Sequence, residues 1–587
     1  MTKLQKRFNG LKSILSREQT EILETALVAM LPVLLTKLSG QFFNLVAASY
    51  FGVQSDSWNK FLIASTIPDL VSNVLIAGLL GTIVIPTLVT ARKKEGEKYF
   101  FKLYSTLINV TLVVFAVISI ILMLSAEFIL PFAVKIFSPE STLSVKEFDS
   151  IANMMRMLLI PQAILAVSVF ISSGLNLYNR FLIPQIAPLF YNIGRISALV
   201  IIVPLMNYSP WGIVIGVYIG AILHLAVQLP LARHVGLKFS FYIDISSKYI
   251  NEIFRISIPR TFALGSEYLG LAINNFLAFS IVGGAAALNF ANSISLIVPQ
   301  LFAFTFAYAS FTKLSEHFAD KNGKALNYLI IKTFNEMLFL ALPFIVTFIV
   351  LRVPVTRLTF GLIPNTNLSL QDTYQIAWVL LWFAVGHVFV MGKWYMYKVF
   401  YSAKDTFTAF WVSVVGLLLT VTLSILFTNL FSHNADFSIS TINFSVENFL
   451  SRGTSLAAVG GVAVGMSIAY SIEFFLLFFV YNKKMYRMDL KLFFSSLGKK
   501  LIAGGLMFTL MYFMFKIWNA LGYAVPTSAE RTYLGSTTLN LLLLTFITVV
   551  TSFLTYYLVC FLLGVEELKL VKRYLNPIFK IGGFKIK

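Results

Sequence analysis

The stretch LYSTLINVTLVVFAVISIILMLS, residues 103–125, decides the fold class of this chain. It contains no charged side chain, and its length suits an α-helix that crosses a hydrocarbon core of about 30 Å, which takes roughly 20 apolar residues. We recognise fourteen apolar segments of this kind in the sequence. They lie near residues 22–50, 58–90, 103–125, 153–176, 182–206, 210–232, 252–282, 286–311, 329–350, 374–400, 405–428, 455–480, 499–519 and 538–563.

Composition supports the same class. Hydrophobic residues make up 58% of the 587 positions and charged residues only 12%, whereas a soluble domain carries about 25% charged residues. The single cysteine, Cys560, lies within an apolar segment, which excludes a disulfide framework and a cysteine-based metal site. We therefore predict an all-α polytopic membrane protein.

The net charge of +20 is concentrated in the polar connections between apolar segments. Alternate connections and the two termini hold most of the basic residues, as in Arg92-Lys93-Lys94, Lys483-Lys484, Lys499-Lys500 and the tail from Lys569 to Lys587. The positive-inside rule then places both termini in the cytoplasm, with an even number of crossings. This distribution indicates membrane topology and not nucleic-acid binding.

The spacing of the segments predicts two lobes of six helices, an arrangement in which transporters place their path between the halves. The expected parts are a cytoplasmic amphipathic N-terminal segment (1–21), an N-lobe (22–232), a C-lobe (252–480), a helix pair (499–563) and a basic cytoplasmic tail (564–587).

Motifs of common enzyme classes are absent from the sequence. It contains no Walker lysine loop, no HExxH and no GxSxG, and its five histidines are scattered. We expect neither catalytic residues nor a bound metal or cofactor.

Charged side chains inside the apolar segments are the strongest functional signal, because each costs about 2.5–3.5 kcal/mol at the bilayer centre and usually faces a wet cavity or a partner. They are Lys37, Lys60, Asp69, Arg156, Arg195, Arg260, Glu267, Glu336, Lys393 and Glu473. The balance is basic in the first lobe, which suits an anionic cargo such as a pyrophosphate.

Lys37 is our first candidate for a phosphate contact, with Lys60, Arg195 and Arg260 as further substrate-binding candidates. Each has a structural alternative. Lys60 lies near a predicted helix end and can snorkel to the interface. Arg260 and Glu267 are two helical turns apart and can form a structural pair.

Four stretches resemble one family in order along both lobes. They are AASYFGVQSDSWNKFLIASTIPDLVSNVLIAGLLGTIVIPTL (47–88), SGLNLYNRFLIPQIAPLFYNIG (173–194), the segment 256–316 that begins ISIPRTFALGSEYLG, and KVFYSAKDTFTAF (398–410). Together they are similar to the MurJ (MviN-type) flippases of the multidrug/oligosaccharidyl-lipid/polysaccharide exporter superfamily.

This resemblance implies an alternating-access flippase of fourteen helices in the bacterial cytoplasmic membrane. Its cargo would be lipid II, an undecaprenyl-pyrophosphate-linked peptidoglycan precursor, bound in a cationic central cavity. The last two helices would form a groove for the lipid tail. Membrane potential or a cation gradient, of Na⁺ or H⁺, would drive the movement. We further expect a monomer in contact with membrane lipids, with cell-wall synthases as candidate partners.

The chain departs from the family at its functional arginines, which lie on the first, second and eighth helices. The first falls at Lys37, which keeps the charge, and the next at Phe43, which does not. The remaining expected charges fall at Ser72 or Asn73, Ala77, Asn292 and Ser293. The usual pyrophosphate clamp is therefore mostly absent, and other cations, Arg156, Arg195, Arg260 or Lys60, would have to supply it.

Four acidic residues are gating or coupling candidates: Asp56, Asp69, Glu267 and Asp405. Asp56 would act at the outer end of the second helix. Asp405 stands at a predicted helix start, where capping is its default role and cation coupling the alternative.

Other functions stay open at this point. One is a flippase for another lipid-linked oligosaccharide, of capsule or O-antigen type. A second is a non-transporting scaffold for cell-wall enzymes, and a third is a drug/cation antiporter of the same superfamily, against which the basic first lobe argues.

Overall fold

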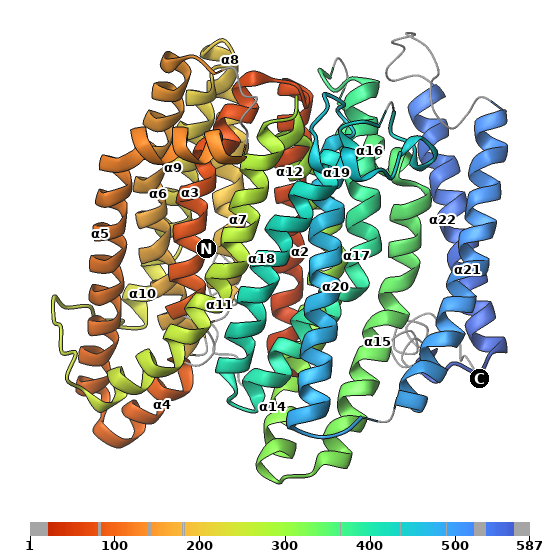
Figure 1. The fold of residues 1–587 in the computed structure, drawn as a ribbon. Helices are drawn as coiled ribbons and strands as arrows, with labels where there is room; N and C mark the ends of the chain where they lie inside the picture. Colours follow the sequence, from red (N-terminus) through yellow and green to blue (C-terminus); the bar gives the residue numbers. More distant parts are fainter. Residues whose placement is uncertain are drawn as a thin grey trace, which may run out of the picture. The chain divides into compact units, whose positions relative to one another are not determined.

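The structure is a computed structural model that describes residues 22–79, 84–137, 143–178, 180, 182–363, 366–434, 436–488, 490–521 and 536–568. The predicted N-terminal segment 1–21 and the tail beyond residue 568 lie outside the described residues. Within the described ranges every regular element is a helix (Figure 1). The all-α prediction is thereby confirmed.

Eleven helices in the described part of the chain are long and apolar enough to cross a membrane. They coincide with the third to sixth and the eighth to fourteenth predicted segments. The first, second and seventh segments form the helices α2 (Ile22–Phe51), α3 (Asp56–Leu79) and α11 (Lys248–Phe279). The chain is a multi-pass membrane protein, while fourteen crossings and cytoplasmic termini stay predictions.

The chain forms two compact units, Met1–Ala286 and Ala287–Lys587. Unit 1 contains α2, α3 and α11 together with α4 (Val84–Glu95), α5 (Glu97–Phe137), α6 (Val145–Leu177), α7 (Leu182–Ser197), a π-helical turn η1 (Ala198–Ile202), α8 (Val203–Leu205), α9 (Pro210–Ala226) and α10 (Leu229–His234). The division differs from the expected lobes because α11 packs along α3, α5 and α4 and so belongs to the first unit.

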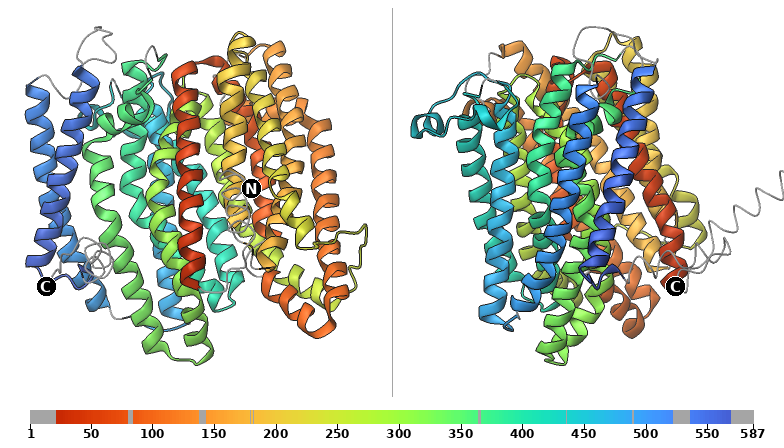
Figure 2. Two further views of the ribbon diagram at one scale, coloured as in Figure 1. Left: turned by 180° about the vertical axis from the view of Figure 1, so that it is seen from behind. Right: turned by 90° about the vertical axis from the view of Figure 1, so that its right-hand side faces the viewer.

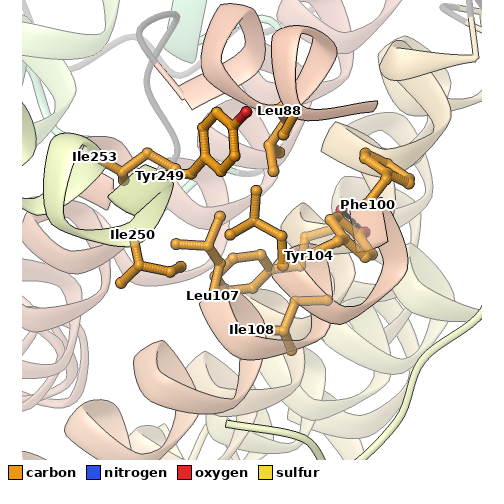
Figure 3. Packing of buried hydrophobic residues seen from close by; sticks show 11 residues of the cluster. Leu88, Phe100, Tyr104, Leu107, Ile108, Tyr249, Ile250 and Ile253 are labelled. Atoms are coloured by element: carbon orange, nitrogen blue, oxygen red, sulfur yellow. Dashed lines mark hydrogen bonds between the residues drawn. The ribbon is translucent and has the colours of Figure 1, made fainter. Parts of the chain in front are cut away.

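Packing in unit 1 is clearest where α4, α5 and α11 meet. Leu88, Phe100, Tyr104 and Leu107 surround Tyr249 and its neighbours in a buried cluster (Figure 3). The Tyr104 hydroxyl donates a 2.7 Å hydrogen bond to the carbonyl oxygen of Phe170 on α6. Apolar burial of this kind contributes roughly 25 cal/mol per Å², so the cluster fixes α5 against α6 and α11.

Close approach of two helices determines the position of α7. A Cβ atom added to Gly194 of α7 would lie 2.6 Å from the backbone of Gly220 on α9. Only glycine fits there, because no side-chain atom can occupy that space. The contact at Gly194 thus fixes the α7 backbone at the residue next to Arg195. The π-helical turn η1 follows the end of α7.

Unit 2 contains α13 (Ile297–Pro299), η2 (Gln300–Phe304), α14 (Thr305–Ala319), α15 (Gly323–Val350), α16 (Arg352–Phe360), α17 (Leu370–Ser402), α18 (Thr406–Phe431), η3 (Ile439–Thr441), α19 (Val446–Leu450), α20 (Ala458–Lys484), α21 (Leu490–Ala520) and α22 (Ser536–Leu562). The boundary between the units falls within α12 (Gly284–Ser295). Helix α17 is buried along most of its length against α20 and α15.

Helices α21 and α22 run side by side (Figures 1 and 2). A buried cluster that includes Phe339, Met507, Met511 and Tyr556 joins them to α15. The groove for a lipid tail that the resemblance implies for this pair stays a prediction.

Candidate functional site

A polar cluster inside unit 1 combines a carboxylate, an amide and a guanidinium from three helices. Asp69 follows Pro68 in α3, and its carboxylate accepts a 2.7 Å hydrogen bond from Nε2 of Gln162 on α6. Gln162 is buried and follows Pro161. The charge of Arg195 on α7 interacts with that of Asp69. This arrangement brings an acidic, an amide and a basic side chain from three helices into one cluster.

The guanidinium of Arg195 lies on an aromatic ring. Its Cζ is 3.5 Å from the ring centroid of Phe43 on α2 and 5.3 Å from that of Tyr191. Phe43 is buried, and its ring is 6.2 Å from that of Trp58 on α3, centroid to centroid. In the described residues Nε of Arg195 has no hydrogen-bond partner. A desolvated cation–π contact stabilises a guanidinium by about 2 kcal/mol, so the ring holds the cation in place.

Helix α2 is joined to α7 by hydrogen bonds beside Lys37. Nδ2 of Asn192 donates to Oγ of Ser39 at 2.9 Å and to the carbonyl oxygen of Thr36 at 3.2 Å. The Lys37 side chain itself is exposed. Lys37 lies six residues before Phe43, a rise of about 9 Å along α2. Two of the four cations predicted to bind substrate, Lys37 and Arg195, therefore belong to the α2–α7 pair.

Lys60 lies elsewhere, at the start of α3. Its Nζ is 2.5 Å from a carboxylate oxygen of Asp56 and 2.6 Å from one of Glu147 on α6. Glu147 also accepts from the backbone amide of Ser144 at 2.7 Å. Two carboxylates thus compensate the single charge of Lys60, about 13 Å along α3 from Asp69. Its predicted role in substrate binding stays a prediction, as does gating by Asp56.

Arg260 and Glu267 are both on α11, half-buried, in the helix that packs along α3. Their spacing of two turns puts them on one face of α11. Whether they pair or contact a substrate stays a prediction.

Asp405 caps α18, which is the default role predicted from the sequence. Its carboxylate accepts from the backbone amide of Thr408 at 3.1 Å, and Nζ of Lys484 on α20 is 2.6 Å away. Burial raises the pKa of Asp405, but the hydrogen bonds from Lys484 and Thr408 outweigh burial and hold that pKa below the ordinary value of an aspartate. A coupling role stays a prediction.

Sequence reasoning did not predict a buried charge pair in unit 2. Nζ of Lys393 on α17 is 3.3 Å from a carboxylate oxygen of Glu473 on α20, and both side chains are almost fully buried. The Tyr397 hydroxyl donates to the other oxygen of Glu473, and Nζ of Lys393 lies 3.9 Å from the ring centroid of Tyr470. The sequence identified both residues as charges within apolar segments. It could not predict that they pair, because sequence spacing does not tell which residues of two separate helices meet.

Comparison with known proteins supplies the family. The family model described as "Lipid II flippase MurJ" matches residues 47–441. A protein of Borreliella burgdorferi named "Probable lipid II flippase MurJ" is 22% identical over 433 residues, which cover 72% of this chain and 81% of that protein.

A protein of Burkholderia cenocepacia named "Lipid II flippase MurJ" is 22% identical over 407 residues, covering 68% of this chain and 77% of its own length. A solved structure titled "Lipid II flippase MurJ, inward closed conformation" superposes with a TM-score of 0.64 at 17% identity, over 90% of this chain and 99% of the other. At that identity the superposition supports the fold alone.

Proposed function

Because the chain belongs to the MurJ family of lipid II flippases, we propose that it moves lipid II across the bacterial cytoplasmic membrane by alternating access. Arg195, stacked on Phe43, is the cation that binds the pyrophosphate. This transport breaks no covalent bond in the cargo.

The observation that carries this proposal is the place of the Arg195 guanidinium. The family resemblance expects an arginine at the position of Phe43, where this chain has a neutral ring. Arg195 reaches that ring from α7 and lies 3.5 Å from its centroid. The charge that α2 lacks is therefore supplied at the same place from another helix.

Stacking leaves the guanidinium suited to an anion. Contact with the ring uses the face of the guanidinium, while its N–H donors point outward in the plane. Two parallel N–H donors match two phosphate oxygens, and such charge-assisted bonds are stronger than neutral ones. Arg195 can thus bind a pyrophosphate without leaving Phe43.

Asp69 supplies the counter-charge while no cargo is bound. Its charge interacts with that of Arg195, and Gln162 fixes its carboxylate through the 2.7 Å hydrogen bond. An arriving pyrophosphate competes with this carboxylate for the guanidinium. Lys37, exposed on α2 beside the α7 contacts, adds a second positive charge on the path of the head group.

Movement of the charged cargo is coupled to membrane potential or to a cation gradient, since the sequence contains no nucleotide-binding motif. The termini face the cytoplasm, the protein acts as a monomer, and cell-wall synthases supply or consume its cargo. These parts of the proposal rest on charge distribution and on the family.

Complementation of a bacterium depleted of its own lipid II flippase tests the proposal. We expect the wild-type chain to restore growth, Arg195→Ala to fail and Arg195→Lys, which keeps the charge without the fork, to restore it in part. Arg156→Ala is the matched control, because Arg156 is also an arginine of unit 1 but pairs with Glu127 at 2.8 Å. Full rescue by Arg195→Ala at equal membrane abundance would contradict the proposal.

A further inference from the structure

Residues 238–246, which we call the strap, connect α10 to α11 and expose large apolar side chains at alternate positions. Phe239 is 46% exposed, Phe241 96%, Ile243 52% and Ile245 60%. The value for Phe241 exceeds that of every other large apolar side chain in the described part of the chain. A row of four such side chains is costly in water, so the strap needs an apolar occupant.

The backbone of the strap is bound to α5 through the residues between these four. Oγ of Ser105 accepts a hydrogen bond from the amide of Ser240 at 3.1 Å. Nδ2 of Asn109 donates to the carbonyl oxygens of Ser240 and Tyr242 at 2.9 and 3.0 Å. Oγ1 of Thr106 accepts from the amide of Asp244 at 3.2 Å. Polar side chains of α5 therefore form hydrogen bonds with backbone groups of the strap that would find no partner in hydrocarbon.

The position of the strap along α5 indicates what it contacts. Exposed apolar side chains on α5 begin at Val113, one turn after Asn109, and continue to Ile136. At 1.5 Å per residue this run is about 35 Å long, close to the thickness of a bilayer core. The strap covers the turns just before that run, alongside the lower half of α5 (Figures 1 and 2). An α5 that crosses the bilayer along this run would place the strap at the level of the lipid head groups.

Charge at the strap suits an anionic surface. Residues 233–248 contain Arg233, Lys238 and Lys248 but a single acid, Asp244. Lys102 of α5 adds a further cation, with Nζ 5.1 Å from the ring centroid of Tyr242. Each basic residue near an anionic leaflet gains on the order of 1 kcal/mol.

We propose that the strap is an interfacial membrane anchor: Phe239, Phe241, Ile243 and Ile245 insert into the leaflet of anionic lipid at the basic end of unit 1. A lipid surface is favoured over a protein partner for two reasons. The exposed apolar side chains of the strap continue the exposed apolar surface of α5, and hydrogen bonds from α5 already satisfy the polar backbone groups of the strap. The anchor holds the connection before α11 at the membrane surface, independently of the cargo that the protein carries.

Nitroxide depth measurements test the anchor on the full chain. In a Cys560→Ala background, which removes the only cysteine, one label is placed at Phe241→Cys. Leu124→Cys on α5, at a side chain 75% exposed, is the lipid control. Lys324→Cys, exposed in the first turn of α15, is the aqueous control. Each variant is reconstituted in vesicles with and without anionic lipid, and collisions with O₂ and with a water-soluble nickel chelate are compared.

We expect the ratio of O₂ to nickel collisions at position 241 to exceed that at 324 several-fold, to lie below that at 124, and to rise when anionic lipid is included. A ratio equal to that at 324 would show the strap in water and overturn the proposal. A label immobilised and shielded from both reagents would show a protein contact and would also overturn it.

Discussion

In our proposal, Arg195 replaces a charge that the neighbouring helix α2 lacks. Its guanidinium lies against the Phe43 ring, and Trp58 packs beside that ring. A salt bridge alone would occupy the N–H donors of the guanidinium, whereas the ring contact occupies its face. The residue is held in place and still able to bind phosphate oxygens.

Asp405 gives a prediction with a defined pH dependence. Its pKa is held below that of an unfolded aspartate, near 4, so its stabilising effect is full above that pH and is lost as the pH falls through the folded pKa. We expect Asp405→Asn, which can still cap the helix, to lower the midpoint of thermal unfolding by a similar small amount at pH 7 and pH 6. The loss should stay below about 1 kcal/mol, because Lys484 is 55% exposed.

As the pH falls from about 4 through the lower folded pKa of Asp405, the two midpoints should converge, because the wild-type carboxyl becomes protonated over that range. Thermal unfolding of the detergent-solubilised protein across this range is the measurement. A difference that persisted unchanged at the lowest pH would mean that the ion pair with Lys484 does not stabilise the cap.

At the scale of residues, sequence reasoning selected two members of the candidate cluster, and their role stays a prediction. Arg195 and Asp69 could be selected because charge is rare in apolar segments. Phe43 could be recognised only as a missing charge, and the sequence offered no reason to select Gln162. These four residues meet because α2, α3, α6 and α7 pack together. Spacing along the sequence does not predict that packing.

Among the elements, α17 and α20 are joined by the buried pair of Lys393 and Glu473. Gly416 of α18 leaves room for it, because a Cβ there would lie 2.6 Å from the Glu473 carboxyl carbon. A buried pair contributes little net stability, but removing one member leaves the other charge without its neighbour, which costs about 3–5 kcal/mol.

We therefore expect Lys393→Met to lower the thermal unfolding midpoint strongly, and the double variant Lys393→Met with Glu473→Gln to recover most of the loss. Lys324→Met, at an exposed lysine of the same unit, should have little effect. Fluorescence-detected thermal unfolding of the four proteins is the measurement. A double variant no more stable than Lys393→Met would mean that the loss does not come from leaving the Glu473 charge without its neighbour.

Helix positions were the most predictable part of the fold. Apolar segments long enough to cross the bilayer recur along the chain, and eleven of them reappear as candidate spans in the described residues. The π-helical turns η1 and η2 were not predicted. They depend on how an inserted residue is accommodated by neighbouring helices, which hydropathy does not report.

For the whole molecule, the contacts divide the chain into two compact units, and the division into two six-helix lobes stays a prediction. The contacts of α11 with α3 and α5 place the division after Ala286, within the predicted C-lobe. The segment between residues 232 and 252 separates the predicted lobes because six apolar segments of similar spacing lie on either side of it. The backbone of this segment hydrogen-bonds to side chains of α5, so the segment is a packed part of unit 1.

Returning the arginine to α2 tests the central claim most directly. In the flippase-depleted bacterium we would compare Arg195→Ala, Phe43→Arg and the two changes combined, at equal membrane abundance. If Arg195 replaces the family arginine expected at Phe43, Arg195→Ala fails to restore growth, Phe43→Arg is impaired by two adjacent cations, and the double variant regains growth. If the double variant is no better than Arg195→Ala although it folds and inserts, the charge at this place does not bind the cargo and the account is wrong.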